Sequence, residues 1–261
     1  MNRFKAGTKI FFSRVVFLII MITVWEIVYR LKLFPELLFP SFRAIFTSLI
    51  ENISNRQILV MTKNTLIIIF KGVSLGTIIA LILMGISLIN KYFYYVIDNI
   101  VLIMNPIPSL AIFPLVILWF GLGTNAMIII LIHSVLWGFL INLMAGIRSM
   151  PQIYKEIGLN LELNKYRMFK DIYLPATMPF FISGLKAALA RAWRSAIAVE
   201  LVAGIMASNA GLGWLMNYQR NTLNIPGLIS TIIIIVIVGI FLEEIVFKVL
   251  ERLTIKKWGL G

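Results

Sequence analysis

The chain alternates between long apolar stretches and short polar connections. A helix that crosses a membrane needs about 20 mostly apolar residues, and six stretches approach or exceed that length. They run approximately Val15 to Leu33, Thr65 to Ile89, Val96 to Phe120, Ala126 to Ile147, Phe180 to Ala207, and Pro226 to Val249. This pattern predicts an all-α integral membrane protein with about six transmembrane helices. No small-residue cleavage motif follows the first stretch, so we expect a retained helix rather than a signal peptide.

Composition excludes the soluble classes. Of 261 residues, 60% are hydrophobic and 13% are charged, whereas soluble domains carry roughly 25% charged residues. Cysteine is absent and histidine occurs once, at position 133. The sequence therefore offers no thiolate zinc or redox site and too few ligands for a transition-metal centre, and it predicts no metal site.

The net charge of +13 is explained by membrane topology. With six spans both termini lie on one side, and that side collects 14 of the 24 Lys and Arg residues, against six on the opposite side and four within spans. The positive-inside rule makes the richer side cytoplasmic. We therefore expect a multi-pass cell-membrane protein with both termini in the cytoplasm, whose surroundings are the lipid bilayer and not nucleic acid.

Two connections are longer than a turn. Phe34 to Thr62 falls outside the cell and predicts a short interfacial helix. Arg148 to Pro179 falls in the cytoplasm, where Ser149 to Gln152 has the form of a capping box that opens a helix with one apolar stripe. A second segment, Tyr166 to Tyr173, is expected to end at the following Leu-Pro pair. This helix pair either docks a soluble partner or folds back on the bundle.

The cytoplasmic loop resembles the EAA loop of ABC importer permeases. Glu156 and the Ile172-x-Leu174-Pro175 ending match the spacing of that motif, whereas Ile157 and Gly158 replace its two alanines and Glu162 replaces its glycine. The resemblance implies a loop that couples to an ATPase through Glu156, Ile157, Gly158, Leu161, Glu162, Ile172, Leu174 and Pro175.

The resemblance extends from about Thr62 to Glu251. The motifs in order are Asn105 to Pro108, Pro114 to Gly123, Gly184 to Lys186, Ala192-Trp193, Glu200 and Gly211 to Trp214, and they resemble permeases of nitrate, taurine and aliphatic sulfonate importers. This implies a type I ABC importer permease, with an N-terminal helix and external segment (1–61), a permease core (62–251) and a cytoplasmic tail (252–261). It also implies separate ATP-binding subunits that use the ATP, so this chain is expected to have no catalytic residues and to bind no cofactor. The other implied partners are an external solute-binding protein and a second permease copy, expected to form a homodimer.

Candidate pathway residues surround a proline cluster in the third stretch. Pro106, Pro108 and Pro114 each remove a backbone donor and should kink or break the helix. Irregular backbone at membrane depth lines either protein or a water-filled cavity. We expect Asn105 and Ser109, which flank the cluster, to face solute, and a simple packing kink is the alternative.

A second set of candidates follows the fifth stretch. Lys186, Trp193 and Glu200 recur every seven residues and share one face of the helix. Glu200 either lines the pathway or forms a buried salt bridge with Arg191 or Arg194. The two arginines also suit an anion, and we expect Arg194 to lie nearer the pathway.

Three further readings bear on function. His133 on its apolar helix is expected to hydrogen-bond another helix rather than carry protons. An integral membrane enzyme would need clustered carboxylates or a nucleophile, and a secondary transporter would need inverted repeats; the sequence shows neither pattern. The leading hypothesis is the permease subunit of an ATP-driven importer for a small anion, with a different small organic solute as the alternative.

Overall fold

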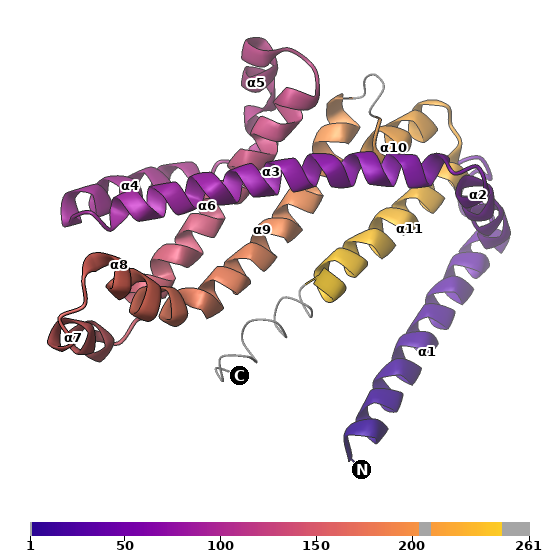
Figure 1. The fold of residues 1–261 in the computed structure, drawn as a ribbon. Helices are drawn as coiled ribbons and strands as arrows, with labels where there is room; N and C mark the ends of the chain where they lie inside the picture. The colour runs from indigo at the N-terminus through magenta and orange to yellow at the C-terminus, as the bar shows by residue number, and fades with distance from the viewer. Residues whose placement is uncertain (1, 204–209, 247–261) are drawn as a thin grey trace.

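The computed structural model describes residues 2–203 and 210–246, and every regular element in this part of the chain is helical (Figure 1). The elements are α1 (Asn2–Arg30), α2 (Phe42–Ser54), α3 (Gln57–Ser87), α4 (Lys91–Met104), the 3₁₀ helix η1 (Ser109–Ile112), α5 (Phe113–Phe120), α6 (Thr124–Arg148), α7 (Gln152–Asn160), α8 (Lys165–Arg167), the π-helix η2 (Met168–Tyr173), α9 (Leu174–Ala203), α10 (Leu212–Asn221), α11 (Ile225–Phe241) and the π-helix η3 (Leu242–Val246).

The expected membrane spans are present. Within the described residues, five continuous helical stretches are long and apolar enough to cross a membrane: 12–30, 57–87, 124–148, 168–203 and 225–244. A sixth span results if the bent pair 91–104 and 109–120 is taken together. The fold class of about six helices is thus confirmed. The last residues of the fifth and sixth predicted stretches, 204–207 and 247–249, lie outside the described part.

The bent pair is the predicted break in the third span. α4 and the following η1–α5 segment meet at 86°, and the non-helical residues between them include Pro106 and Pro108. Pro114 causes no kink, contrary to expectation, because it occupies the first turn of α5, where a helix needs no N–H donor. α4 is tied to the end of α6, since Arg148 donates to Asp98 (2.5 Å) and to the Tyr94 hydroxyl.

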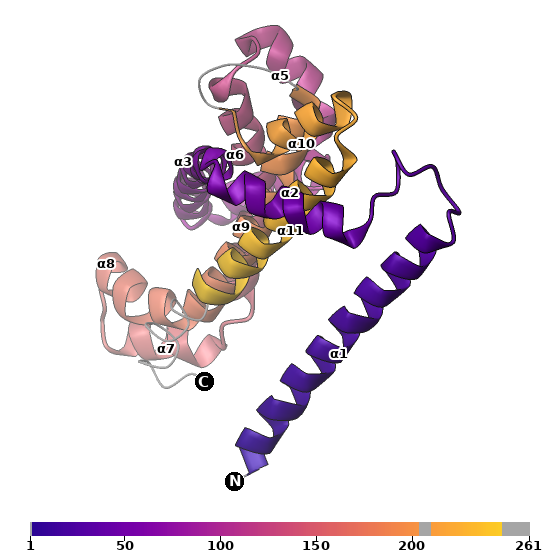
Figure 2. The same cartoon turned by 90° about the vertical axis from the view of Figure 1, so that its right-hand side faces the viewer.

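The first helix stands apart from the bundle. Figure 2 shows α1 separated from the other spans and joined to them through α2. Near the connection between α1 and α2, Trp25 stacks on Phe39 with ring centroids 4.1 Å apart and donates its indole N–H to the Pro40 carbonyl (3.0 Å). α2 is the expected short helix, and its Asn52 side chain donates to Ser230 of α11 (2.9 Å).

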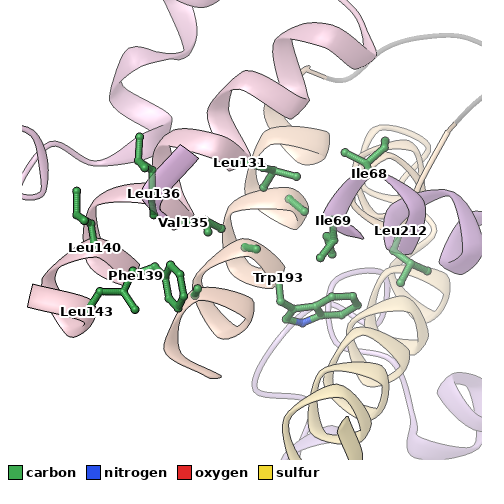
Figure 3. Packing of buried hydrophobic residues seen from close by; sticks show 14 of the residues in the cluster. Ile68, Ile69, Leu131, Val135, Leu136, Phe139, Leu140, Leu143, Trp193 and Leu212 are labelled. Atoms are coloured by element: carbon green, nitrogen blue, oxygen red, sulfur yellow. The ribbon is translucent and has the colours of Figure 1, made fainter. Parts of the chain in front are cut away.

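The core lies between α3, α6 and α9 (Figure 3). Small residues let α3 approach α6 closely. A Cβ added at Gly72 would collide with Leu131, and one added at Gly76 would lie 3.0 Å from the Cβ of Val135. Apolar membrane helices associate mainly through such tight packing, because lipid and side chains are equally apolar.

The two ends of the molecule differ in structure. α7 and α8 lie at the same end as the N-terminal end of α1, whereas α5 and α10 lie at the opposite end (Figures 1 and 2). The loop between the fourth and fifth spans therefore projects beyond the bundle and can be reached from that side.

Candidate functional site

A cavity opens where the broken span faces α6 and α9. Its volume is about 220 Å³. Three segments contribute its walls: the break between α4 and η1, the middle of α6, and the second half of α9. The lining residues are Asn105, Pro106, Ile107, Pro108, Ser109, His133, Ser134, Trp137, Arg191, Arg194 and Ser195.

Three serine hydroxyls join these walls. The Ser195 hydroxyl of α9 lies 2.9 Å from the Ser109 hydroxyl of η1 and 2.8 Å from the Ser134 hydroxyl of α6. Each hydroxyl can donate or accept. These two hydroxyl contacts therefore hold the broken span against the two continuous helices.

Arg191 enters the same cavity from α9 with two of its nitrogens unpaired. Its Nε and Nη2 atoms are buried and have no hydrogen-bond partner. The guanidinium lies directly over Gly138 of α6, in the space that a Cβ at position 138 would occupy. This glycine is therefore required by a neighbouring side chain and not by backbone conformation.

Two aromatic groups of α6 complete this wall. His133 and Trp137, one helical turn apart, make an edge-to-face contact with ring centroids 6.2 Å apart. Both histidine nitrogens and the indole N–H are buried without a hydrogen-bond partner. The expected interhelical hydrogen bond of His133 is thus not formed, because the ring lies in the cavity wall and contacts the Trp137 ring.

The cavity is rich in donors and positively charged. Arg194, exposed on α9, adds a second guanidinium one turn beyond Arg191. Among the described residues that line the cavity, no carboxylate offsets these charges. Such a site favours an anion over a cation.

Five of the eight predicted pathway residues meet in this cavity: Asn105, Pro106, Pro108, Ser109 and Arg194. The other three belong to different surroundings. Lys186 is exposed on α9. Trp193 is 8% exposed and packs in the core, with its indole against Gly239 of α11 (Figure 3).

Glu200 forms neither of the arrangements expected from its helix. It is 2% exposed and does not line the cavity. Its carboxylate accepts hydrogen bonds from the Thr65 hydroxyl of α3 (2.9 Å) and from the Gly213 backbone N–H (2.8 Å). Arg191 and Arg194 make no ion pair with it, because both guanidinium groups lie at the cavity. The carboxylate instead satisfies one free N–H group, that of Gly213, at the start of α10, where a helix favours negative charge.

The loop between the fourth and fifth spans forms the expected helix, α7, but without the capping box. Pro151 precedes the first turn and has no capping side chain, while the Ser149 hydroxyl bonds back to the Gly146 carbonyl of α6. The apolar stripe of α7 is exposed: Ile153 by 54%, Ile157 by 41% and Leu161 by 64%. Glu156 is exposed as well. The stripe does not fold back on the bundle.

In the turn after α7, Glu162 stands where the family motif has a glycine, and its backbone is left-handed. The N–H of Leu163 donates to the Gly158 carbonyl (3.0 Å) and that of Glu162 to the Leu159 carbonyl (3.0 Å), which is a Schellman ending. Glu162 takes a φ of 51°, a left-handed conformation that glycine adopts most readily. The helix-to-helix turn therefore forms despite the substitution.

The second loop segment does not end at Leu174-Pro175. The π-helix η2, which contains Ile172, runs directly into α9. A π-turn shifts the hydrogen-bond pattern just before Pro175, which has no N–H to donate. Gly158 sits against Met168 of η2, since a Cβ there would lie 2.6 Å from the Met168 Cε. α7 is thereby placed directly on η2, which extends α9 at its N-terminal end.

Comparison with known proteins identifies the family. The profile of the binding-protein-dependent transport system inner membrane component matches residues 72–256. The chain belongs to this family. It is therefore an ABC transporter permease, a transport component with several membrane spans, and its fold is that of a type I ABC permease.

Several curated permeases are similar over most of this region. A putative ABC transporter permease protein of Methanocaldococcus jannaschii is 32% identical over 56% of this chain and 54% of its own length. A probable ABC transporter permease protein of Haemophilus influenzae is 28% identical over 89% of this chain and 93% of its own length. The nitrate import permease protein of Leptolyngbya laminosa is 28% identical over 69% of this chain and 61% of its own length. This permease thus spans little more than half of two of these relatives.

Sequence reasoning missed several residues of the permease cavity. The sequence pattern did not predict Ser134, Trp137 or Ser195 as cavity residues, nor the role of Gly138. A signal was available on α6, where His133, Ser134 and Trp137 share one face of an otherwise apolar span. Thr65, which holds Glu200, gives no comparable local signal.

Proposed function

We propose that this permease forms the membrane pathway of an ATP-driven importer for a small anion. The observation that carries the proposal is the cavity at the broken span, which has two arginines and, among the described lining residues, no carboxylate. Broken helices at membrane depth are tolerated where they line a cavity. The nitrate and bicarbonate permeases among the relatives support an anionic solute.

The exposed stripe of α7 is proposed as the docking surface for an ATP-binding subunit. The stripe is apolar, exposed and projects beyond the bundle at the end of α6 and α9 (Figure 1). Through Gly158 and Met168 it rests on η2, which continues into the cavity-lining helix α9. A movement imposed on α7 would therefore reach Arg191 and Arg194 through one helix. ATP is consumed by the partner, and the permease switches between two packings of its helices.

The remaining assembly is proposed on the same basis. Two copies of this chain would pair, with an external binding protein delivering solute to the end that carries α5 and α10. Both termini and α7 would face the cytoplasm, in line with the excess of basic residues on that side.

Reconstitution tests this function. The permease is placed in liposomes with its ATPase and binding-protein partners, and uptake of labelled nitrate, bicarbonate or an aliphatic sulfonate is measured with and without ATP. We expect ATP-dependent accumulation of one anion. Accumulation of a neutral or cationic solute alone would overturn the anion assignment, and no ATP-dependent uptake of any solute offered would overturn the importer.

A further inference from the structure

Unpaired buried nitrogens gather on one wall of the cavity. They are Nε and Nη2 of Arg191, Nε1 of Trp137 and both ring nitrogens of His133. Buried polar groups in folded proteins are almost always hydrogen-bonded, because an unpaired group loses its interaction with water and gains nothing. Groups left open on a cavity wall therefore indicate a ligand that pairs with them.

The chemistry of these groups defines the ligand. A guanidinium and an indole N–H can only donate, whereas a neutral histidine has one donor and one acceptor nitrogen, and the guanidinium keeps its positive charge. The hydroxyls of Ser109, Ser134 and Ser195 can also donate. A matching ligand must accept several hydrogen bonds and carry negative charge, which describes an oxyanion.

The position of Arg191 is set by Gly138. Because the guanidinium occupies the volume of an absent side chain, it lies close against the α6 backbone. Arg194 lies one turn away on the same helix, so the two charges repel each other when the cavity holds no anion. An anion between the helices would relieve that repulsion.

The volume limits the size of the ligand. A cavity of about 220 Å³ holds roughly seven water molecules at about 30 Å³ each. This volume admits an oxyanion of a few heavy atoms with part of its hydration shell.

We infer that the permease itself contains a binding site for a small oxyanion, anchored by Arg191 and the Trp137 indole N–H, with Gly138 as the residue that admits the guanidinium. This inference deepens the proposed function, on which it rests, by assigning the anion to particular donors. Arg194 is the exposed cation beside the site, so its loss should weaken binding less than the loss of Arg191.

Thermal protection of the purified full-length chain tests the site. The fraction of monodisperse protein left after heating is measured in sodium nitrate or sodium methanesulfonate, with sodium gluconate at equal ionic strength as reference. A ligand that binds only the folded state raises the unfolding temperature as its concentration passes the Kd. We expect a saturable rise of several degrees with nitrate or methanesulfonate.

Matched variants assign this rise to the proposed donors. Arg191→Gln and Gly138→Ala should abolish it, and Trp137→Phe should raise the apparent Kd several-fold. Gly85→Ala should preserve it, because a Cβ at position 85 meets no atom within 4 Å. If Arg191→Gln does not fold, Trp137→Phe and Gly138→Ala still decide the result.

Two outcomes would overturn the site: no saturable rise in the wild type, or an equal rise in the wild type, Arg191→Gln and Gly138→Ala. Transport is judged separately. Wild-type uptake without anion protection would overturn the site and leave the importer standing, whereas anion protection without uptake would keep the site and reject the importer.

Discussion

Thr65 and Glu200, which are 135 positions apart, meet at a buried node between α3 and α9. The Thr65 hydroxyl donates to the Glu200 carboxylate (2.9 Å) and accepts from the Leu212 backbone N–H (3.0 Å). The carboxylate also accepts from Gly213 (2.8 Å). One threonine and one glutamate thus fasten the first turn of α10 to two core helices.

Removing either member of this node should destabilise the permease. Thr65→Val leaves the Leu212 N–H without its acceptor, and Glu200→Leu leaves two donors unpaired. Each unpaired buried group costs about 1–3 kcal/mol, so both variants should unfold at lower temperature in detergent. Thr65→Ser and Glu200→Gln, which keep most of the hydrogen bonds, should lose less. A Glu200→Leu variant as stable as the wild type would contradict a structural role for the node.

Close packing of α3 on α6 should not tolerate a larger residue at position 72. Gly72→Ala places a methyl group against the Leu131 side chain, and overpacking of this kind costs about 1–3 kcal/mol. We expect a lower unfolding temperature for Gly72→Ala than for the control Gly85→Ala on the same helix, where the added Cβ meets open space. Equal unfolding temperatures would show that α3 and α6 can separate without cost.

The exposed stripe of α7 should be required for coupling and not for folding. Ile157→Asp and Glu156→Lys change exposed side chains, so the unfolding temperature should stay within about 1 °C of wild type, since such surface changes are usually worth less than about 0.5 kcal/mol. Association with the ATPase and ATP-driven uptake should both fall. Glu51→Lys, an equally exposed charge reversal on α2, should leave ATPase association unchanged. Wild-type uptake in both α7 variants would remove the docking role.

Side-specific labelling should place α7 in the cytoplasm. The chain has no cysteine, so single cysteines report without background. Asn160→Cys in α7 and Thr222→Cys after α10 are both exposed, and we expect an impermeant thiol reagent to label Thr222→Cys from outside and Asn160→Cys only after the membrane is opened. Asn217, in α10 itself, is buried and unsuited to labelling. Labelling of both cysteines from one side would break the six-span topology.

The sequence by itself determined the features that depend on neighbouring residues along the chain. Spans are visible because crossing a bilayer needs an uninterrupted apolar length, and the break at Pro106 and Pro108 is visible because proline lacks a donor wherever it stands. The exposed stripe of α7 follows from helical periodicity. Pro175 shows the limit of such rules, because a π-turn lets the helix continue through it.

Only the tertiary structure decided which polar groups pair across helices. Helical spacing put Lys186, Trp193 and Glu200 on one face, yet the folded bundle buries Trp193 against α11 and gives Glu200 to Thr65 and α10. Gly138 is required only because Arg191, 53 positions further along the chain, lies over it in the folded bundle. The physical reason is that periodicity along one helix specifies a direction, whereas the partner in that direction depends on how distant helices pack.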